Sequence, residues 1–278
     1  MKAITEAKIR DAVADLCIRA NLYLRKDVLS ALKKAFGRET DKRAKRSIKA
    51  ILDNAAIAKR EKMAICQDTG MPVVFVEIGR QVKLTGDLKS AINKGAASGY
   101  GRAYLRDSII EDPLSRGSAS GAPVIIHIDI VKGNTLKLTV LPKGFGCENK
   151  SALKMFKPTA KLTEIKDFIV AAVENAGPDA CPPYVVGVGI GGTADYASLL
   201  AKKALLRKIG VHGPQPTVHK LEQQLFKEIN KLNIGPMGLG GKTTVLAVHI
   251  ETYPTHIAGL PVAVNLSCHA LRSATLTL

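Results

Sequence analysis

Three short stretches, far apart along the chain, carry residue types that can do chemistry. The first places a cysteine, an amide and a carboxylate side by side, at Cys66, Gln67 and Asp68. The second and third each carry one cysteine, Cys181 and Cys268, at a break between expected elements. Such isolated cysteines suit a disulfide framework poorly, but they could meet at one metal centre. Their spacings match no zinc finger, ferredoxin motif or Cys-x-x-Cys pair, so the residues alone leave packing, reactivity and metal binding open.

Three glycine-rich stretches are further candidates for binding anions. Residues 144–150 read Gly-Phe-Gly-Cys-Glu-Asn-Lys, and spaced glycines suit a close approach of the backbone to a ligand. Residues 187–192 have the letters G-x-G-x-x-G, but no second strand with an acidic end follows within ~20 residues, which argues against nucleotide binding. Residues 235–244 fail as a phosphate-binding loop because Pro236 stands where a glycine is required. Their glycine turn with Lys242 still suits a carboxylate.

The elements that must position these stretches begin with helices. Apolar residues at helical spacing predict helices over residues 5–24, 26–35 and 41–62. Cys17 lies on the buried face of the first and is interpreted as a core residue. Further helices are predicted at residues 87–99, 162–175, 191–208 and 216–232.

Apolar runs between these helices predict strands. They lie at residues 73–76, 185–190, 244–250 and 261–266. Two more runs, 124–131 and 136–141, are joined at Gly133-Asn134 and predict a β-hairpin. Together these patterns predict a mixed α/β fold in one domain over residues 1–278. In it, residues 1–62 form a helical scaffold, followed by mixed β-sheets packed with helices.

The composition is that of a globular protein, with 46% hydrophobic and 23% charged residues and a net charge of +17. The basic residues are spread along the chain and aromatic residues make up only 4%, so nucleic-acid binding is not favoured. Anionic substrates, an acidic partner subunit or solvated helix faces fit the charge equally well. No apolar run is long enough to span a bilayer and the N-terminus lacks a secretory apolar core, so we expect a cytoplasmic protein.

Several motifs, taken together, point to one kind of metal centre. The set runs in order through nearly the whole chain, and its members are Cys66-Gln67-Asp68-Thr69-Gly70, Gly144-Phe145-Gly146-Cys147-Glu148-Asn149-Lys150, Cys181-Pro182-Pro183-Tyr184, Gly191-Gly192-Thr193, residues 235–244 and Ser267-Cys268. Together they resemble the iron-sulfur class I fumarate hydratase and tartrate dehydratase family. The resemblance covers the alpha subunit, or N-terminal part, of that family. The C-terminal part, a separate beta chain in two-subunit members, is absent from this sequence.

The resemblance implies a 4Fe-4S cluster held by three cysteines, which are Cys66, Cys181 and Cys268 in this sequence. Three thiolates would anchor the cluster and leave one iron open as a Lewis acid for a substrate carboxylate and hydroxyl. Cys147 stands where the family usually has serine, and we interpret it as a residue that does not bind the cluster. The alternative, that it replaces one of the three ligands, stays open.

The same resemblance implies the residues that act on the substrate. Asp68 and His256 are the expected catalytic residues, with Asp68 pairing with His256 or a water as a proton relay, or orienting a neighbour. Gln67, Arg106, Gly146 and Lys242 are the expected substrate-binding residues. The guanidinium of Arg106 suits a planar carboxylate because it can donate two parallel hydrogen bonds.

The implied function is that of the alpha subunit of a 4Fe-4S hydro-lyase, first of all fumarate hydratase, which hydrates fumarate to L-malate. The alternative within the family is L(+)-tartrate dehydratase, and the alternative from another class is a basic nucleic-acid-binding or scaffold protein. The expected partners are a beta subunit in an α2β2 assembly, an alpha-alpha homodimer and a small dicarboxylate substrate, with no membrane. Without the beta chain we expect no activity.

Overall fold

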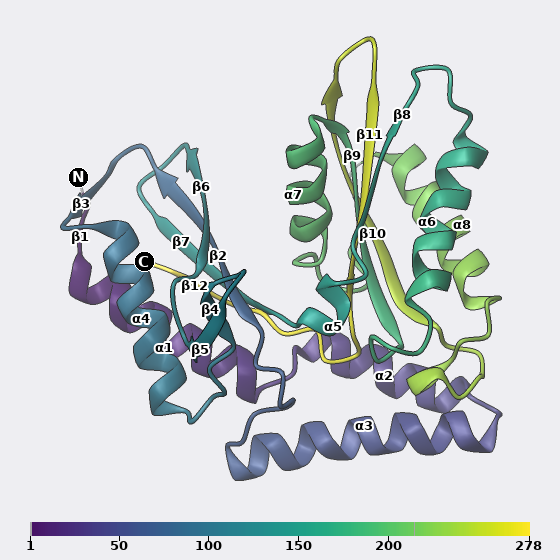
Figure 1. Ribbon diagram of the computed structural model, residues 1–278, viewed down its shortest axis with the longest axis horizontal. Coiled ribbons are helices and arrows are strands. Elements are labelled where there is room, and N and C mark those ends of the chain that lie inside the picture. Colours follow the sequence, from purple (N-terminus) through teal and green to yellow (C-terminus); the bar gives the residue numbers. More distant parts are fainter. Residues whose placement is uncertain (1, 214) are drawn as a thin grey trace. The chain divides into compact units, whose positions relative to one another are not determined.

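The computed structural model in Figure 1 describes residues 2–213 and 215–278, and it divides into two compact units. The first unit consists of residues 1–25, 55–145 and 272–278, and the second of residues 26–54 and 146–271. Each unit thus combines segments that are distant in sequence. The expected mixed α/β class is confirmed, because each unit packs helices on a four-stranded sheet that contains parallel and antiparallel neighbours.

The sheet of the first unit has the strand order β12-β7-β2-β6. Its strands are β2 (Met71–Gly79), β6 (Ile125–Val131), β7 (Leu136–Lys143) and β12 (Ala274–Thr277). Strand β2 pairs parallel with β6 and antiparallel with β7, and β12 pairs antiparallel with β7. The last residues of the chain therefore belong to the same sheet as the strand that directly follows the Cys66 turn.

The expected hairpin of residues 124–131 and 136–141 is wrong. Both strands form, but β2 lies between them in the sheet, and each pairs with β2 instead of with the other. The backbone of residues 79–81 bonds to Val131, Gly133 and Thr135, so the end of β2 occupies the place that a hairpin turn would need. A local turn signal cannot reveal a strand that inserts from 50 residues away.

Helices α1 (Glu6–Leu22) and α4 (Leu88–Arg102) complete the core of the first unit. Apolar residues of both helices pack with β2 and β7 in one buried cluster, which includes Cys17. Two short pairs of strands complete this unit: β1 (Lys2–Thr5) with β3 (Val82–Thr85), and β4 (Ile109–Asp112) with β5 (Arg116–Ser120).

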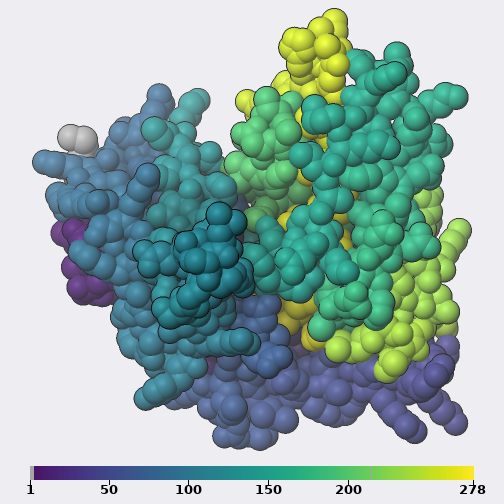
Figure 2. Space-filling view, in the orientation of Figure 1, coloured from purple at the N-terminus to yellow at the C-terminus, as the bar shows by residue number. Residues whose placement is uncertain are grey.

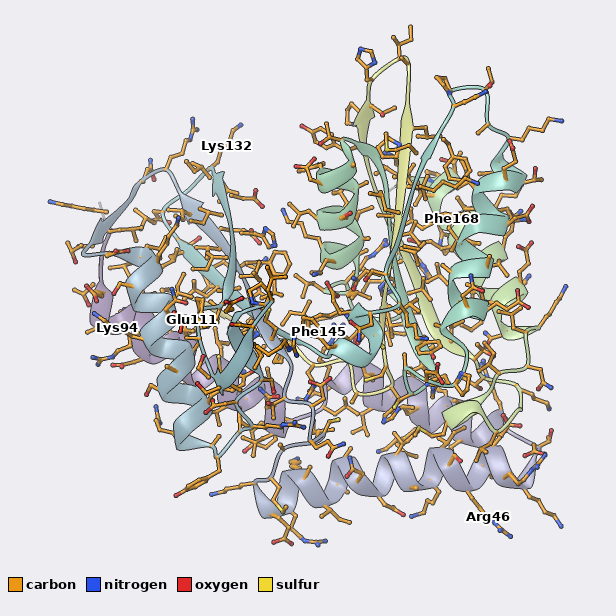
Figure 3. All side chains as sticks on the ribbon, viewed as in Figure 1. Arg46, Lys94, Glu111, Lys132, Phe145 and Phe168 are labelled. Atoms are coloured by element: carbon orange, nitrogen blue, oxygen red, sulfur yellow. The ribbon has the colours of Figure 1, made fainter. Side chains whose placement is uncertain are left out.

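The sheet of the second unit has the strand order β10-β9-β11-β8. Its strands are β8 (Ala152–Phe156), β9 (Tyr184–Gly192), β10 (Val245–Thr255) and β11 (Leu260–Ser267). Figure 1 shows α7 (Ala194–Ala204) on one face and α6 (Leu162–Ala176) with α8 (Pro216–Asn230) on the other. Phe168 of α6 points toward the sheet (Figure 3), where its ring meets the edge of Phe156 at a centroid distance of 5.7 Å.

The glycines of residues 187–192 have a packing role in this unit. A Cβ added at Gly187 would lie 2.1 Å from the carbonyl oxygen of Ala201, and one added at Gly189 would lie 2.0 Å from that of Ala197. Only glycine lets helix α7 approach β9 so closely. The G-x-G-x-x-G letters are therefore explained by helix packing.

Two of the remaining helices, α2 (Lys26–Arg38) and α3 (Lys42–Glu61), lie in the expected helical N-terminal region. Two short helices, α5 (Phe145–Glu148) and η1 (Pro236–Gly238), lie further along the chain. No helix within residues 2–213 and 215–278 is long and apolar enough to cross a membrane.

Candidate functional site

The Cys66 turn of the first unit is held from behind by helix α1. The backbone N–H of Ile65 donates to the carbonyl oxygen of Asn21 over 3.0 Å. The Asn21 side chain, which is fully buried, accepts in turn from Nη1 of Arg272 at 3.2 Å. These bonds position a half-buried cysteine at the surface end of a rigid polar network.

Arg272 is the buried cation of this network, with a relative exposure of 3%. Its Nη2 donates to the backbone carbonyl of Asp68 over 2.8 Å, two residues after Cys66. A buried guanidinium favours nearby negative charge, such as a thiolate or a carboxylate. Arg272 therefore both shapes the turn and makes its surroundings positive.

The carboxylate of Asp68 is bonded through both of its oxygens. Oδ1 accepts from the N–H of Gly70 and Oδ2 from the N–H of Phe145, each over 2.9 Å. Gly70 has a φ of +72°, and an added Cβ would lie 2.8 Å from the backbone of Pro142, so only glycine fits there. The Asp68 carboxylate is thus oriented by backbone groups, and each oxygen keeps a lone pair for a further partner.

Arg106 lies beside the same turn. Its backbone carbonyl accepts from the hydroxyl of Thr69 over 2.7 Å. The buried hydroxyl of Tyr100 donates to the backbone carbonyls of Thr69 and Gly70. Burial raises the pKa of the Tyr100 phenol, so it stays a neutral donor. The Arg106 guanidinium itself is exposed and makes no ion pair with the described residues. Within the first unit, the backbone of Arg106 therefore lies against the turn that carries Cys66, Gln67 and Asp68.

In the second unit, the turns that carry Cys181 and Cys268 lie side by side. The carbonyl oxygen of Cys181 accepts from the backbone N–H of His269 at 3.3 Å and from its ring Nδ1 at 3.1 Å. Because a carbonyl only accepts, Nδ1 of His269 is the donor in this bond. Cys181 has a φ of +57°, a region sparsely populated by residues with a side chain and typical of functional sites.

The glycine-rich loop of residues 235–244 meets the same region at its start. The N–H of Met237 donates to the carbonyl of Pro182 over 2.8 Å. The loop then turns toward helix α2, where the backbone N–H of Lys242 donates to Oε2 of Glu39 over 2.8 Å. Lys242 is exposed, and its backbone is anchored at the end of the loop away from Pro182.

Helix α5 carries part of the glycine-rich motif of residues 144–150. An added Cβ at Gly146 would meet nothing within 4 Å, so the packing of this chain does not require glycine there. The next residue, Cys147, is buried, and its Sγ donates to the carbonyl of Ala180 over 3.2 Å. Glu148 then anchors the helix through Lys202 and Asn265.

The five cysteines divide into two groups, and in the described residues none is in a disulfide. Cys17 and Cys147 are buried, whereas Cys66, Cys181 and Cys268 are partly exposed. Burial raises the pKa of the Cys17 thiol to about 12, so it does not form the thiolate that binds metal. Cys66, Cys181 and Cys268 are therefore the partly exposed thiols of the chain, and thiolates are the usual ligands of iron-sulfur clusters.

His256 is placed differently from the other expected residues of the second unit. It lies in the exposed turn between β10 and β11, where its Nδ1 accepts from the N–H of Ala258 over 3.1 Å. This turn protrudes from its unit in Figure 2, in yellow. Cys268 follows the opposite end of β11, so the strand separates the two residues by roughly 25 Å at ~3.3 Å per residue. The structure does not bring His256 to the Cys181 and Cys268 turns.

Two residues of these turns escaped the sequence analysis. Arg272 gave no sequence signal, because its burial depends on the return of β12 to the first sheet. His269 had one signal, its position directly after Cys268.

Comparisons with known proteins show which family this chain resembles. The family model described as "Fumarate hydratase (Fumerase)" matches residues 10–277. A Methanocaldococcus jannaschii protein named "Putative L(+)-tartrate dehydratase subunit alpha" is 42% identical over 275 residues, which cover 96% of this chain and 96% of that protein. An Escherichia coli K12 protein named "L(+)-tartrate dehydratase subunit alpha" is 32% identical over 273 residues, which cover 97% of this chain and 90% of that protein.

Proposed function

The chain belongs to the fumarate hydratase (Fumerase) family of hydro-lyases, and from this premise we propose that it is the alpha subunit of an iron-sulfur enzyme that interconverts fumarate and L-malate. One observation carries the proposal: the three cysteines that the resemblance implies as ligands are the three partly exposed ones, while Cys17 and Cys147 are buried. The alternative of a basic nucleic-acid-binding or scaffold protein has no support in the family match.

We assign Cys66, Cys181 and Cys268 as ligands of a 4Fe-4S cluster. Bound there, the cluster supplies an open iron that acts as a Lewis acid toward the carboxylate and hydroxyl of the substrate. The chain's own residues then hold the substrate and move its proton. Cys147 is excluded from the ligand set because its sulfur is buried against the carbonyl of Ala180.

Residues of the Cys66 turn would bind and orient the substrate. The exposed guanidinium of Arg106 donates two parallel hydrogen bonds to one carboxylate, and the exposed amide of Gln67 offers a further donor. Gly146 lets the substrate approach the backbone, in a space where a side chain meets no other atom of this chain. Lys242 contributes positive charge from the surface.

Asp68 is the proposed acid-base group of this turn. Two backbone N–H groups fix the orientation of its carboxylate, and a lone pair on each oxygen can still take or give a proton through water. A fixed carboxylate needs no reorganisation at the moment of proton transfer.

His256 is proposed to act on a neighbouring protomer in the alpha-alpha homodimer. It is too far along β11 to serve the Cys268 of its own chain, and the protruding turn exposes it to a second copy. Mixing chains that carry His256→Ala with chains that carry Cys268→Ser tests this. The mixed assembly should regain part of the activity that both parents lack, whereas no regain would refute action between protomers.

The proposed partner is a beta subunit in an α2β2 assembly in the cytoplasm. The similar proteins named above are called "subunit alpha", which supports a second chain. Expression with a beta-type chain, followed by anaerobic reconstitution with iron and sulfide, should give a brown complex that hydrates fumarate. The alpha chain alone should be inactive, and a colourless complex without hydratase activity would contradict the proposal.

L(+)-tartrate is the second candidate substrate, favoured by the names of the similar proteins. Dehydration of tartrate needs the same open iron, with room for one more hydroxyl. Assays of both substrates on one reconstituted preparation separate the two candidates, because kcat/KM for the true substrate should exceed that for the other by at least ~100-fold.

A further inference from the structure

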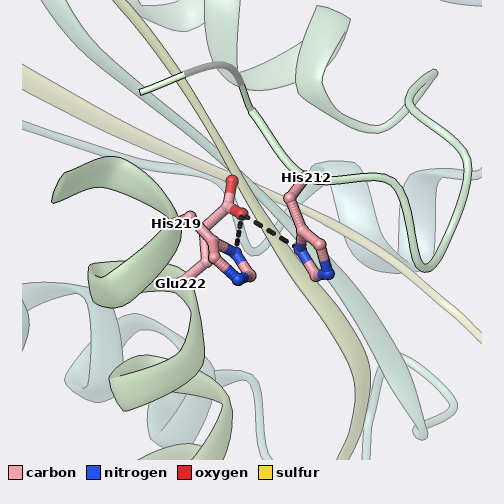
Figure 4. A group of neighbouring side chains, drawn as sticks. All are labelled: His212, His219 and Glu222. Atoms are coloured by element: carbon pink, nitrogen blue, oxygen red, sulfur yellow. Dashed lines mark ion pairs between the residues drawn. The ribbon is translucent and has the colours of Figure 1, made fainter. Parts of the chain in front are cut away.

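A separate group of metal-binding side chains lies in the second unit, among residues that the proposed reaction does not use. His219 and Glu222 project from helix α8 at positions i and i+3, and His212 lies in the segment before that helix. Figure 4 shows both imidazole rings facing one carboxylate. Each residue offers one ligand atom, and the three atoms lie within 4.8 Å of one another.

Glu222 is an acid buried in an arrangement that suits a metal ligand. Its side chain is 4% exposed. Oε1 accepts from the N–H of Ile250 over 2.8 Å and from Nη2 of Arg207 over 2.6 Å. Oε2 is buried without a hydrogen-bond partner and lies 3.9 Å from Nδ1 of both histidines. Metal-binding carboxylates share this division, with one oxygen held by the protein and the other aimed at the ion.

His219 presents a buried nitrogen to the same point. Its Nδ1 has no hydrogen-bond partner, and its Nε2 lies 2.9 Å from the side-chain amide of Gln223. The Gln223 atom at this distance is its amide nitrogen Nε2. A flip of this amide, which exchanges its nitrogen and oxygen, lets Nε2–H of His219 donate to Gln223 and leaves the lone pair of Nδ1 for a metal. With the amide in that orientation, His219 has the hydrogen bond on its other ring nitrogen that metal-binding histidines usually have.

An ion pair alone explains the cluster less well. Both separations of 3.9 Å are too long for hydrogen bonds, and the two rings lie 3.7 Å apart between centroids, so two imidazolium charges would repel each other. Arg207 is shared between Glu222 and Glu251, whose Oε1 lies 3.6 Å from its Nε. The second carboxylate offsets part of the guanidinium charge and leaves Glu222 able to attract a cation.

A pocket beside the cluster leaves room for a further ligand. It is lined by His212, Glu222 and His249 and by the apolar residues Phe226, Leu246 and Val248. Three protein ligands leave at least one position of a tetrahedral ion open to water or to a small anion from this pocket.

We propose that His212, His219 and Glu222 bind a divalent transition-metal ion, with zinc the best match to two imidazole nitrogens and one carboxylate oxygen. Tetrahedral zinc at ~2.1 Å from its ligands separates them by about 3.4 Å, so the present 3.9 Å must shorten by about 0.5 Å. His212 can supply this shift, because its side chain is 54% exposed in the segment before α8.

The test is a zinc titration of the full-length chain in competition with a chromogenic chelator. Cys66, Cys181 and Cys268 are replaced by serine in all proteins, so that thiolates do not compete. The parent should bind one zinc ion per chain, and His212→Ala and His219→Ala should each bind it ~100-fold more weakly. His127→Ala, which removes a histidine from β6 in the first unit, should bind as tightly as the parent.

Two further measurements keep the test decisive. Glu222→Gln should also weaken zinc binding. If the loss of the carboxylate charge beside Arg207 unfolds this variant, His212→Ala still tests the proposal, because His212 is exposed. With the native cysteines restored, the zinc content of the parent and of His212→Ala should differ by one ion per chain. No stoichiometric zinc in the parent, or a zinc affinity in the two histidine variants equal to that of the parent, would overturn the proposal. Neither result would affect the proposed hydro-lyase activity.

Discussion

The cysteine turns of the two units are held by different kinds of interaction. In the first unit, the Cys66 turn depends on one buried side chain, because the guanidinium of Arg272 donates to the carbonyl of Asp68 and to the side chain of Asn21, whose backbone carbonyl accepts from Ile65. In the second unit, one backbone bond and one bond from the imidazole of His269 join the Cys181 and Cys268 turns. A turn held by side chains can be lost through one substitution, whereas a turn held by backbone bonds should tolerate more.

The largest effect is expected from Arg272→Met. It removes two hydrogen bonds from a charged donor and leaves the buried Oδ1 of Asn21 without this partner. The free energy of unfolding should fall by about 3 kcal/mol, measured by urea denaturation. Arg102→Met is the matched control, because that side chain is 58% exposed and its ion pair is long at 3.7 Å, so the change should stay below ~0.5 kcal/mol. Equal effects in both variants would mean that the buried Arg272 does not hold the Cys66 turn.

A smaller effect is expected from adding a methyl group beside Asp68. A Cβ at Gly144 would lie 3.0 Å from Oδ2 of Asp68, so Gly144→Ala should cost about 1–2 kcal/mol of stability. Gly146→Ala, two residues later, adds the same group in open space and should change stability by less than ~0.5 kcal/mol. We expect the second variant instead to raise KM, measured on the reconstituted complex, and an unchanged KM would remove Gly146 from the substrate site.

His269 tests the turns of the second unit. His269→Ala keeps the backbone bond to Cys181 and loses only the ring bond, so stability should fall by about 1 kcal/mol. His269→Asn can restore a side-chain N–H near the carbonyl and should recover part of the loss. Both are measured by urea denaturation. A loss in His269→Ala as large as that in Arg272→Met would mean that side chains hold both turns equally.

The smallest effect concerns the buried sulfur of the first unit. The pKa of Cys17 is raised by burial to about 12, so folding favours the neutral thiol. This contribution to stability is complete below the pKa of the unfolded thiol, near 8.5, and it is lost as pH rises toward 12. Between pH 7.5 and 9.0 the parent should lose ~0.8 kcal/mol more than Cys17→Ala, measured by urea denaturation at both pH values. A smaller slope in the parent would contradict the buried state of this thiol.

The sequence predicted local structure better than long-range pairing. Helix α3 was expected at residues 41–62 and lies at Lys42–Glu61, because its apolar spacing is a local signal. The hairpin of β6 and β7 failed because β2 inserts between them, and periodicity does not specify a strand's partner. The burial of Arg272 could not be predicted for the same reason, since it depends on the sheet that β12 joins. The distance of His256 from Cys268 was implicit in the strand predicted at residues 261–266, because an extended strand separates the residues at its two ends.

The central claim is that Cys66, Cys181 and Cys268 hold one cluster with an open iron. Mössbauer spectroscopy of the ⁵⁷Fe-reconstituted complex tests it most directly, with and without added malate. The account predicts one iron site whose spectrum changes with malate, loss of the cluster in each of the three cysteine-to-serine variants, and a full cluster in Cys147→Ser and Cys17→Ser. A full cluster in any of the first three variants, or its loss in Cys147→Ser, would contradict the account.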